Sequence, residues 1–335
     1  MPTQIVPLEL RMSATLQAPR SPNLALLHAS LGLADEAAVH DEHPVLLPLS
    51  GQHHLHARWY APRGRLRAAA LIAPATGVPQ RFYAGLARWL AARGYATLTL
   101  DYAGLSASRA AVAEGASMRD WMLRDLPLAL DEVQARAREA QVPVVWIGHS
   151  LGGHALPLQP GLQGIDAALC IGAQLPAFHR WPAGHRRWGA RFFFQRYVPW
   201  LVRWTGRLPR WALGGGEDLP AAAAMDWSRW GQLPNYYASD PDMAVRLRVP
   251  DWRGVAHFWC VSDDWVFGPE PAVQALVDAF DGAPGVAELH RLRPQDVGRR
   301  RLGHFAPFAR HVGERLWPRV FDRLEAAVPA LRGAP

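Results

Sequence analysis

Residues 142–153, VPVVWIGHSLGG, decide the fold class. The run VPVVWIG is apolar throughout, and turn signals bound it, which is typical of a strand buried on both faces of a parallel sheet. It passes directly into Gly-His-Ser-Leu-Gly around Ser150, a G-x-S-x-G pattern that opens an expected helix. In this setting the pattern predicts a sharp turn that exposes the Ser150 hydroxyl above the sheet. Gly148 and Gly152 remove side chains that would collide in such a turn.

Short apolar runs alternate with helical patterns on both sides of this stretch. Strands are expected at residues 44–49, 54–61, 67–74, 95–100, 167–171, 256–261 and 286–292. Helices are expected at residues 24–37, 81–93, 118–140, 271–280 and 311–327. This alternation predicts an α/β fold with a mostly parallel sheet.

The alternation stops between residues 178 and 250, where no buried strand is expected. We interpret residues 179–250 as an inserted helical cap, residues 44–178 and 251–335 as the core, and residues 1–43 as an N-terminal extension. The ligand crevice of such a sheet lies at the carboxyl ends of its strands, so the cap is expected to lie over Ser150. Five aromatic residues of the cap are expected to line an apolar pocket there: Phe192, Phe193, Phe194, Trp200 and Trp204.

Ser150 needs a base to accept its proton before it can act as a nucleophile. Of the 14 histidines, His304 is the best placed, because it follows the last expected strand and gives the order Ser…Asp…His. Seven others are less well placed, because they precede Ser150, flank it or lie in the cap: His53, His54, His56, His149, His154, His179 and His185. Asp264 is preferred over Asp263 as the acid that orients His304, and the other carboxylate is expected to cap the following turn.

Two backbone amides are expected to stabilise the negative charge that develops on a substrate carbonyl. The Leu151 N–H lies at the start of the expected helix after Ser150. The second donor is expected in the loop after the strand at residues 67–74. Val78 is preferred there, because Pro79 has no N–H and Gly77 allows close backbone approach.

These motifs resemble those of the α/β-hydrolase superfamily: GHSLGG (148–153), SDDW (262–265) and LGHF (302–305). Four further segments resemble a bacterial group of predicted α/β-hydrolases of undefined substrate: ATGVPQRFY (75–83), GEDLP (216–220), MDWSRW (225–230) and GHFAPF (303–308). The resemblance covers about residues 45–325. It implies an α/β-hydrolase fold with Ser150 as nucleophile, Asp264 as acid and His304 as base. The sequence departs from the group at Ala103 and Ser106, where Arg and Gly are usual.

The leading hypothesis is a serine hydrolase of the carboxylesterase or lipase type (EC 3.1), which cleaves an ester, thioester or related acyl substrate. The alternatives are amide or C–C bond cleavage on the same fold, and a binding module that uses the Arg/Trp-rich cap. No metal or organic cofactor is expected. Cys170 and Cys260 each lie in an expected buried strand and are interpreted as reduced core thiols.

The positive net charge of the chain indicates which kinds of partner it could bind. The net charge is +7, and all 36 basic residues are arginine. Eight of these arginines and five tryptophans lie in residues 180–211. This composition suits contact with a lipid surface, whereas no nucleic-acid-binding motif is present and no such partner is expected. No secretory signal or long apolar run is evident, so a cytoplasmic protein is predicted.

Overall fold

The computed structural model describes residues 40–332, in which one sheet of eight strands forms the centre of the core. The order across the sheet is β1-β2-β4-β3-β5-β6-β9-β10. The strands are β1 (His40–Pro48), β2 (His54–Pro62), β3 (Ala68–Ala73), β4 (Tyr95–Leu100), β5 (Val144–His149), β6 (Ala167–Ile171), β9 (Val255–Val261) and β10 (Val286–Leu292). β2 is antiparallel to β1 and to β4, and all other neighbours are parallel.

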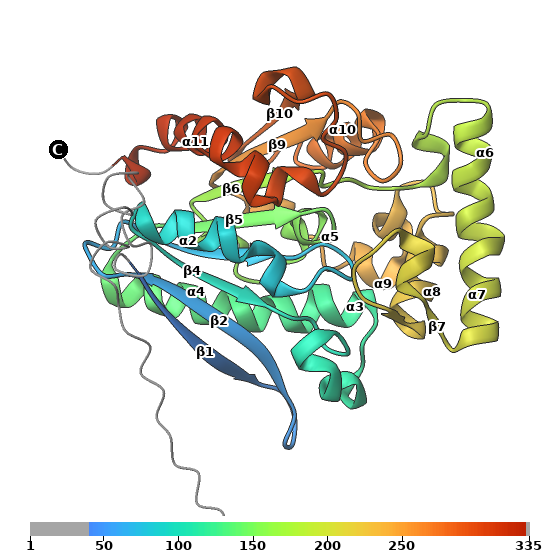
Figure 1. Cartoon of the computed structure of the whole chain (residues 1–335), viewed down its shortest axis with the longest axis horizontal. Helices are drawn as coiled ribbons and strands as arrows, with labels where there is room; N and C mark the ends of the chain where they lie inside the picture. Colours follow the sequence, from blue (N-terminus) through green and yellow to red (C-terminus); the bar gives the residue numbers. More distant parts are fainter. Residues whose placement is uncertain (1–39, 333–335) are drawn as a thin grey trace, which may run out of the picture. The chain divides into compact units, whose positions relative to one another are not determined.

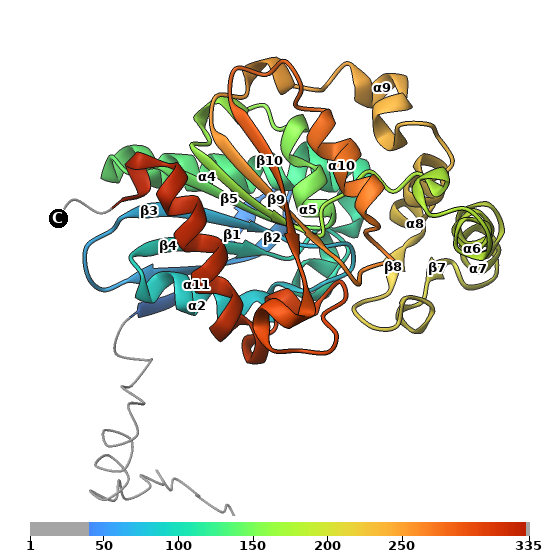
Figure 2. The same ribbon diagram turned by 90° about the horizontal axis from the view of Figure 1, so that it is seen from above.

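Helices cover both faces of this sheet (Figures 1 and 2). On one face α2 (Ala84–Ala92) and α11 (Arg310–Ala327) pack against one apolar cluster. On the other face α4 (Leu126–Ala140), α5 (Leu151–His154) and α10 (Glu270–Asp278) pack against a second cluster. Strands β3, β5 and β6 are buried along their whole length, as expected for central strands covered on both sides.

The segment between β6 and β9 is mainly helical. Its elements are α6 (His185–Phe192), a π-helical turn (Phe193–Tyr197), α7 (Val198–Thr205), β7 (Arg207–Leu208), β8 (Leu219–Pro220), α8 (Ala221–Trp230) and α9 (Pro241–Ala244). Figure 1 shows α6 and α7 as one continuous helix on the side of this segment remote from the sheet. The expectation of no buried strand here was wrong for β7 and β8, whose Leu208 and Leu219 are buried. Strands of two residues are too short to show a sequence period.

The strands and helices expected for the rest of the core are confirmed, with small differences. The helix expected at residues 118–140 contains a π-helical turn (Trp121–Asp125) between α3 (Met118–Asp120) and α4. β1 begins at His40, so residues 40–43 pair with β2 rather than preceding the core. The helix expected at residues 24–37 lies outside the described residues.

Two further findings concern the described residues as a whole. Cys170 and Cys260 are buried free thiols, as predicted. None of the helices between residues 40 and 332 is long and apolar enough to cross a membrane.

Candidate active site

Ser150 occupies the turn between β5 and α5, with φ of 51° and ψ of −113°. A positive φ is costly for a residue with a side chain, so the surrounding backbone must hold it. The Ser150 N–H donates to the Ile171 carbonyl at 3.3 Å, and the Ser150 carbonyl accepts from the amides of Gly153 and His154 at 3.0 Å each. The sharp strand-to-helix turn predicted from the sequence is therefore present, with Ser150 at its tip.

The glycines beside Ser150 are required by close backbone approach. A Cβ atom on Gly148 would lie 2.4 Å from the Cα of Gly153. A Cβ atom on Gly152 would lie 2.0 Å from the Ala73 carbonyl oxygen in β3. Neither contact can be relieved by a side-chain rotation, because the opposing atoms belong to the backbone. The expectation that these two glycines remove collisions is confirmed.

His304 and Asp264 form a buried pair beyond the ends of β10 and β9. The distance from His304 Nδ1 to Asp264 Oδ2 is 2.5 Å. An ionised carboxylate only accepts hydrogen bonds, so the imidazole proton resides on Nδ1 and Nε2 keeps its lone pair. This arrangement makes His304 Nε2 a proton acceptor.

Asp263 has a different position from its neighbour. Its carboxylate accepts hydrogen bonds from the backbone amides of Leu302 at 2.9 Å and Gly303 at 3.0 Å. Asp263 thus fixes the loop that carries His304 without a hydrogen bond to the imidazole. Of the two carboxylates that the sequence left open, the structure brings Asp264 to His304.

Ser150 and His304 line one cavity of about 420 Å³. The segment between β6 and β9, which the sequence predicts to be a cap, contributes Leu213, the glycines of residues 214–216 and Trp227 to its wall. Aromatic residues of the core form much of the remainder: Phe82, Phe267 and Phe305. Arg81 is the one charged side chain, and none is acidic, among the described residues that line the cavity. The cavity is therefore mainly apolar near Ser150.

The aromatic residues predicted to form the cap wall do not line this cavity. Trp200 and Trp204 are 57% and 72% exposed on α7. Phe192 is also largely exposed, whereas Phe193 and Phe194 pack behind Trp227, with ring centroids 5.3 Å and 6.0 Å away. The prediction was wrong because helical spacing shows which residues share a face, not which face meets the core.

The two predicted amide donors differ in their surroundings. Within the described residues, the Leu151 N–H has no hydrogen-bond acceptor. The Val78 N–H instead donates to the Ala75 carbonyl at 3.1 Å and closes a turn, so this amide is already engaged. Thr76 lies in the same turn and lines the cavity, and its N–H has no acceptor in residues 40–332. No residue pattern in this loop indicates which amide the turn engages.

The loop after β3 lies directly against the cap. The Glu217 N–H donates to the Gly77 carbonyl at 2.8 Å. A Cβ on Gly216 would lie 2.7 Å from the same carbonyl oxygen, and one on Gly77 would lie 2.8 Å from Leu219 Cδ2. Both glycines have positive φ. The Glu217 side chain adds ion pairs to Arg81 at 3.1 Å and Arg109 at 3.0 Å.

Gln174 is a neighbour of Ser150 that no sequence motif indicated. Its Nε2 donates to Ser150 Oγ at 3.4 Å and to the Phe267 carbonyl at 3.2 Å. No hydrogen bond joins Ser150 Oγ to His304 in the described structure. Gln174 follows β6 at the same end of the sheet as Ser150. Its position after a predicted strand was the one sequence feature that could have indicated its place near Ser150.

His149 is fully buried, and both of its ring nitrogens are hydrogen-bonded. Its Nε2 donates to the His304 carbonyl at 3.1 Å, and the Tyr83 hydroxyl donates to its Nδ1 at 2.8 Å. That hydroxyl accepts from the Ala75 N–H at 2.9 Å. Burial holds the pKa of His149 well below its usual value, so the ring is neutral, as these roles require.

One group of side chains in residues 40–332 could hold a metal ion. It consists of His257 on β9 with Glu288 and His290 on β10. None of the three lines the cavity at Ser150.

A family model described as serine aminopeptidase, S33, matches residues 63–248, more than half of the chain. The chain belongs to this family. The matched S33 region contains Ser150 and most of the cap and ends before Asp264 and His304. A search of curated proteins finds no significant match.

Solved structures similar to this S33 family member include lipases, esterases and an acylaminoacyl peptidase from Pyrococcus horikoshii. A soluble variant of monoglyceride lipase from Saccharomyces cerevisiae is 12% identical with a TM-score of 0.60, over 87% of this chain and 96% of that one. Brefeldin A esterase, a bacterial homologue of human hormone-sensitive lipase, is 15% identical with a TM-score of 0.54, over 96% and 90%. A carboxyl esterase from Bacillus coagulans is 11% identical with a TM-score of 0.57, over 86% and 99%.

At these identities the likeness concerns the fold, and it confirms the predicted α/β-hydrolase fold. Family and fold together make the chain a serine α/β-hydrolase. The narrower bacterial group suggested by the sequence motifs stays a prediction.

Proposed function

We propose that the protein hydrolyses a carboxylic ester or thioester, with Ser150 as nucleophile, His304 as base and Asp264 as the acid that orients it. The observation that carries this proposal is the buried His304–Asp264 pair in the same cavity as Ser150. Catalytic hydrogen bonds are often long or absent until substrate binds, so the missing Ser150–His304 bond is compatible with this role.

The reaction proceeds in two halves. The Ser150 hydroxyl adds to the substrate carbonyl while its proton passes to His304 Nε2. The tetrahedral intermediate then collapses, and its carbon–oxygen or carbon–sulfur bond to the leaving group breaks as His304 returns the proton to that group. Water attacks the resulting acyl-enzyme with His304 again as base, which releases the carboxylic acid and restores the Ser150 hydroxyl. Asp264 stabilises the imidazolium form of His304 in both halves.

The negative charge on the carbonyl oxygen needs preorganised donors. The Leu151 amide has no other acceptor in the described residues, which supports its predicted role. For the second donor we propose Thr76 in place of Val78, because the Val78 amide is engaged by Ala75 and the Thr76 amide is not.

The cavity favours esters over the peptide substrates that the family description suggests. An aminopeptidase must bind the positively charged amino terminus of a peptide, and desolvating that ammonium group requires a carboxylate partner. No described residue of the cavity wall is acidic, and Arg81, its one charged residue, is paired with Glu217. Its mainly apolar wall instead suits a medium or bulky acyl group. Amide and C–C bond cleavage remain the alternatives to be compared by assay.

Labelling with a fluorophosphonate probe, followed by hydrolysis of p-nitrophenyl esters, tests this proposal. Ser150→Ala should abolish both labelling and turnover. Ser262→Ala, at an exposed serine after β9, should change neither. Labelling that survives Ser150→Ala would overturn the choice of nucleophile, and labelling without ester turnover would favour amide or C–C substrates.

We also propose that the outer face of α6 and α7 contacts an anionic lipid surface. Four aromatic side chains recur at a spacing of four residues around Arg196 and are 46–72% exposed: Trp188, Phe192, Trp200 and Trp204. In an α-helix, side chains four residues apart differ by about 40° in direction around the helix axis, so such a row drifts from one face to another. The π-helical turn between the two helices has more residues per turn and reduces the drift, which keeps the aromatic row on one face.

The charge around this aromatic row identifies the kind of lipid. Residues 178–216 contain no acidic residue, and seven exposed arginines lie in this stretch of the chain: Arg186, Arg187, Arg191, Arg196, Arg203, Arg207 and Arg210. Tryptophan and arginine together suit the boundary between acyl chains and anionic headgroups. Residues 213–216, at the end of this stretch of the chain, line the cavity at Ser150.

A further inference from the structure

His257, Glu288 and His290 form a cluster at the edge of the sheet that the proposed hydrolysis does not use. His257 pairs with Glu288 in the register of the parallel strands β9 and β10, and Trp259 pairs with His290. Residues paired in this way lie on the same face of the sheet. Trp259 belongs to the apolar cluster under α11, so the three side chains lie on the α11 face.

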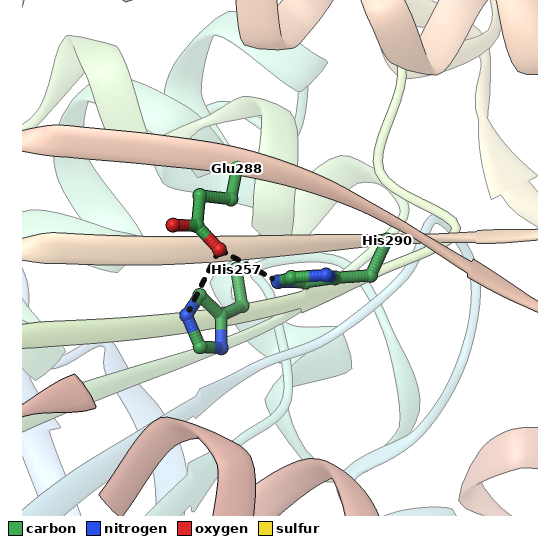
Figure 3. A group of neighbouring side chains, drawn as sticks. All are labelled: His257, Glu288 and His290. Carbon is green, nitrogen blue, oxygen red and sulfur yellow. Dashed lines mark ion pairs between the residues drawn. The ribbon is translucent and has the colours of Figure 1, made fainter. Parts of the chain in front are cut away.

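The side chains of this cluster point at one another, with the Glu288 carboxylate between the two imidazoles (Figure 3). Glu288 Oε2 is 3.3 Å from His290 Nε2 and 3.8 Å from His257 Nε2. A tetrahedral ion with bonds of about 2.0–2.2 Å holds neighbouring donor atoms about 3.3–3.6 Å apart. The carboxylate oxygen therefore already has nearly the spacing to both nitrogens that a bound ion would impose.

Polar atoms of both histidines lack hydrogen-bond partners in the described structure. These atoms are His257 Nδ1 and His290 Nε2, and both are buried. The His257 side chain is 1% exposed and the His290 side chain is 10% exposed. An ion bound between the two Nε2 atoms would satisfy His290 Nε2 and would leave His257 Nδ1 unpaired. Glu288, which is 49% exposed, gives an ion a route from solvent.

We propose that His257, Glu288 and His290 bind one divalent transition-metal ion such as Zn²⁺. Imidazole and carboxylate ligands suit this class of ion, and the fourth position would hold water. The ion would join β9 to the edge strand β10 and so act as a structural clamp, remote from the cavity at Ser150.

Two features limit the affinity of this site. Arg323 on α11 adds positive charge near both histidines. His257 Nδ1 also lacks the hydrogen-bond acceptor that usually orients a ligating imidazole.

Titration of chelator-treated full-length protein with Zn²⁺ in a calorimeter tests the proposal, with Co²⁺ absorption to report four-coordinate geometry. We expect one ion per chain and a rise in Tm of about 5 °C at saturating Zn²⁺. Glu288→Gln should weaken binding at least tenfold and remove the rise in Tm. Because Glu288 is half exposed, this variant should fold, which the Tm without metal would verify.

The His40–Glu42 pair supplies a matched control. His40 Nε2 lies 3.1 Å from Glu42 Oε1, but the pair has no second histidine within the described residues. Glu42→Gln should leave Zn²⁺ binding unchanged. Equal affinities for the wild type and Glu288→Gln, or binding lost equally in Glu42→Gln, would overturn the proposal and indicate adventitious binding.

Discussion

The Tyr83 hydroxyl and the His149 imidazole share a buried hydrogen bond of 2.8 Å that links two loops of the candidate active site. On one side the hydroxyl accepts from Ala75, at the start of the turn that contains Thr76. On the other side His149 donates to the carbonyl of His304. Tyr83 and His149 are therefore positioning residues that couple the proposed charge-stabilising loop to the proposed base.

Tyr83→Phe should disturb catalysis without altering substrate binding. The change leaves the Ala75 amide and His149 Nδ1 unpaired in the core, each at a cost of about 1–3 kcal/mol. We expect a clear loss of unfolding free energy and a several-fold lower kcat at nearly constant KM, measured by urea unfolding and ester kinetics. Tyr60→Phe is the control, because its hydroxyl has no hydrogen bond to residues 40–332. Equal effects of the two substitutions would contradict the role of Tyr83.

Asp264→Asn and Asp263→Asn should differ strongly in their effect on turnover. Asn at residue 264 stabilises the wrong tautomer of His304, so kcat should fall by roughly 10³–10⁴-fold. Asn at residue 263 weakens only the contacts to Leu302 and Gly303, and its effect should stay within about tenfold. Steady-state kinetics on one p-nitrophenyl ester would measure both. If Asp263→Asn proved the more damaging, the acid would have to be reassigned.

Acyl-chain preference should depend on Trp227 and not on Trp204. The wild type is expected to prefer butyrate through octanoate over acetate, as measured by kcat/KM on p-nitrophenyl esters. Trp227→Ala enlarges the cavity and should move the preference toward longer chains. Trp204 is exposed on α7, and Trp204→Ala should leave the profile unchanged. A profile that favours acetate in the wild type would refute an acyl-binding role of the cavity.

The stability of the protein should fall below pH 6.5, in part through His154. Burial lowers the pKa of this histidine to about 3. The unfolded chain takes up the proton near pH 6.5 and the folded protein does not, so the unfolding free energy falls by about 1.4 kcal/mol per pH unit below 6.5. This loss should continue as the pH falls toward 3.

His154→Gln should remove that contribution, so the difference between variant and wild type should change by about 2 kcal/mol between pH 6.5 and 5. Urea unfolding at both pH values measures it. Burial raises the pKa of Asp125 to about 6, which acts in the opposite direction below pH 6 but equally in both proteins. A difference that does not vary with pH would show that His154 is protonated in the folded state.

The aromatic row of α6 and α7 should bind anionic vesicles. Replacing Trp200 and Trp204 together by Ser should weaken sedimentation with phosphatidylglycerol-containing vesicles at least tenfold, because two exposed anchors are lost. Val245→Ser removes an exposed apolar side chain outside this helix and serves as the control. Equal binding to neutral vesicles would contradict the role of the arginines. Dimerisation, or RNA binding, that the double substitution abolishes would assign the face to that partner instead.

The sequence identified the core of the fold and the residues of the candidate site because both depend on local patterns. The apolar run before Ser150 and the glycines beside it carry steric information that a short segment contains. Strand order placed Asp264 and His304 at the same end of the sheet. The predictions that failed depend on three-dimensional contacts.

Val78 and the cap aromatics illustrate this limit. Whether the Val78 amide is free depends on the conformation of one turn, which Gly77 permits but does not determine. Whether Trp200 and Trp204 point inward depends on the rotation of a long helix about its axis, which its spacing pattern leaves open. The contact of Gln174 with Ser150 was not predicted, because a single amide side chain is not part of any recognisable sequence motif.

The close backbone approach of Gly216 to Gly77 couples the wall of the cavity to the loop that is proposed to stabilise the transition state. Residues 213–216 line the cavity that is proposed to bind the acyl group, and Gly77 follows Thr76, whose amide is the proposed second donor to the transition-state charge. A side chain on Gly216 would displace the backbone of Gly77, whereas one on Gly77 would first meet the Leu219 side chain and would be strained by its positive φ. Variation that reshapes the cap at this point will therefore alter the rate as well as the selectivity. Divergence toward new substrates should proceed by paired changes in the two loops, and laboratory evolution that mutates the cap alone should stall.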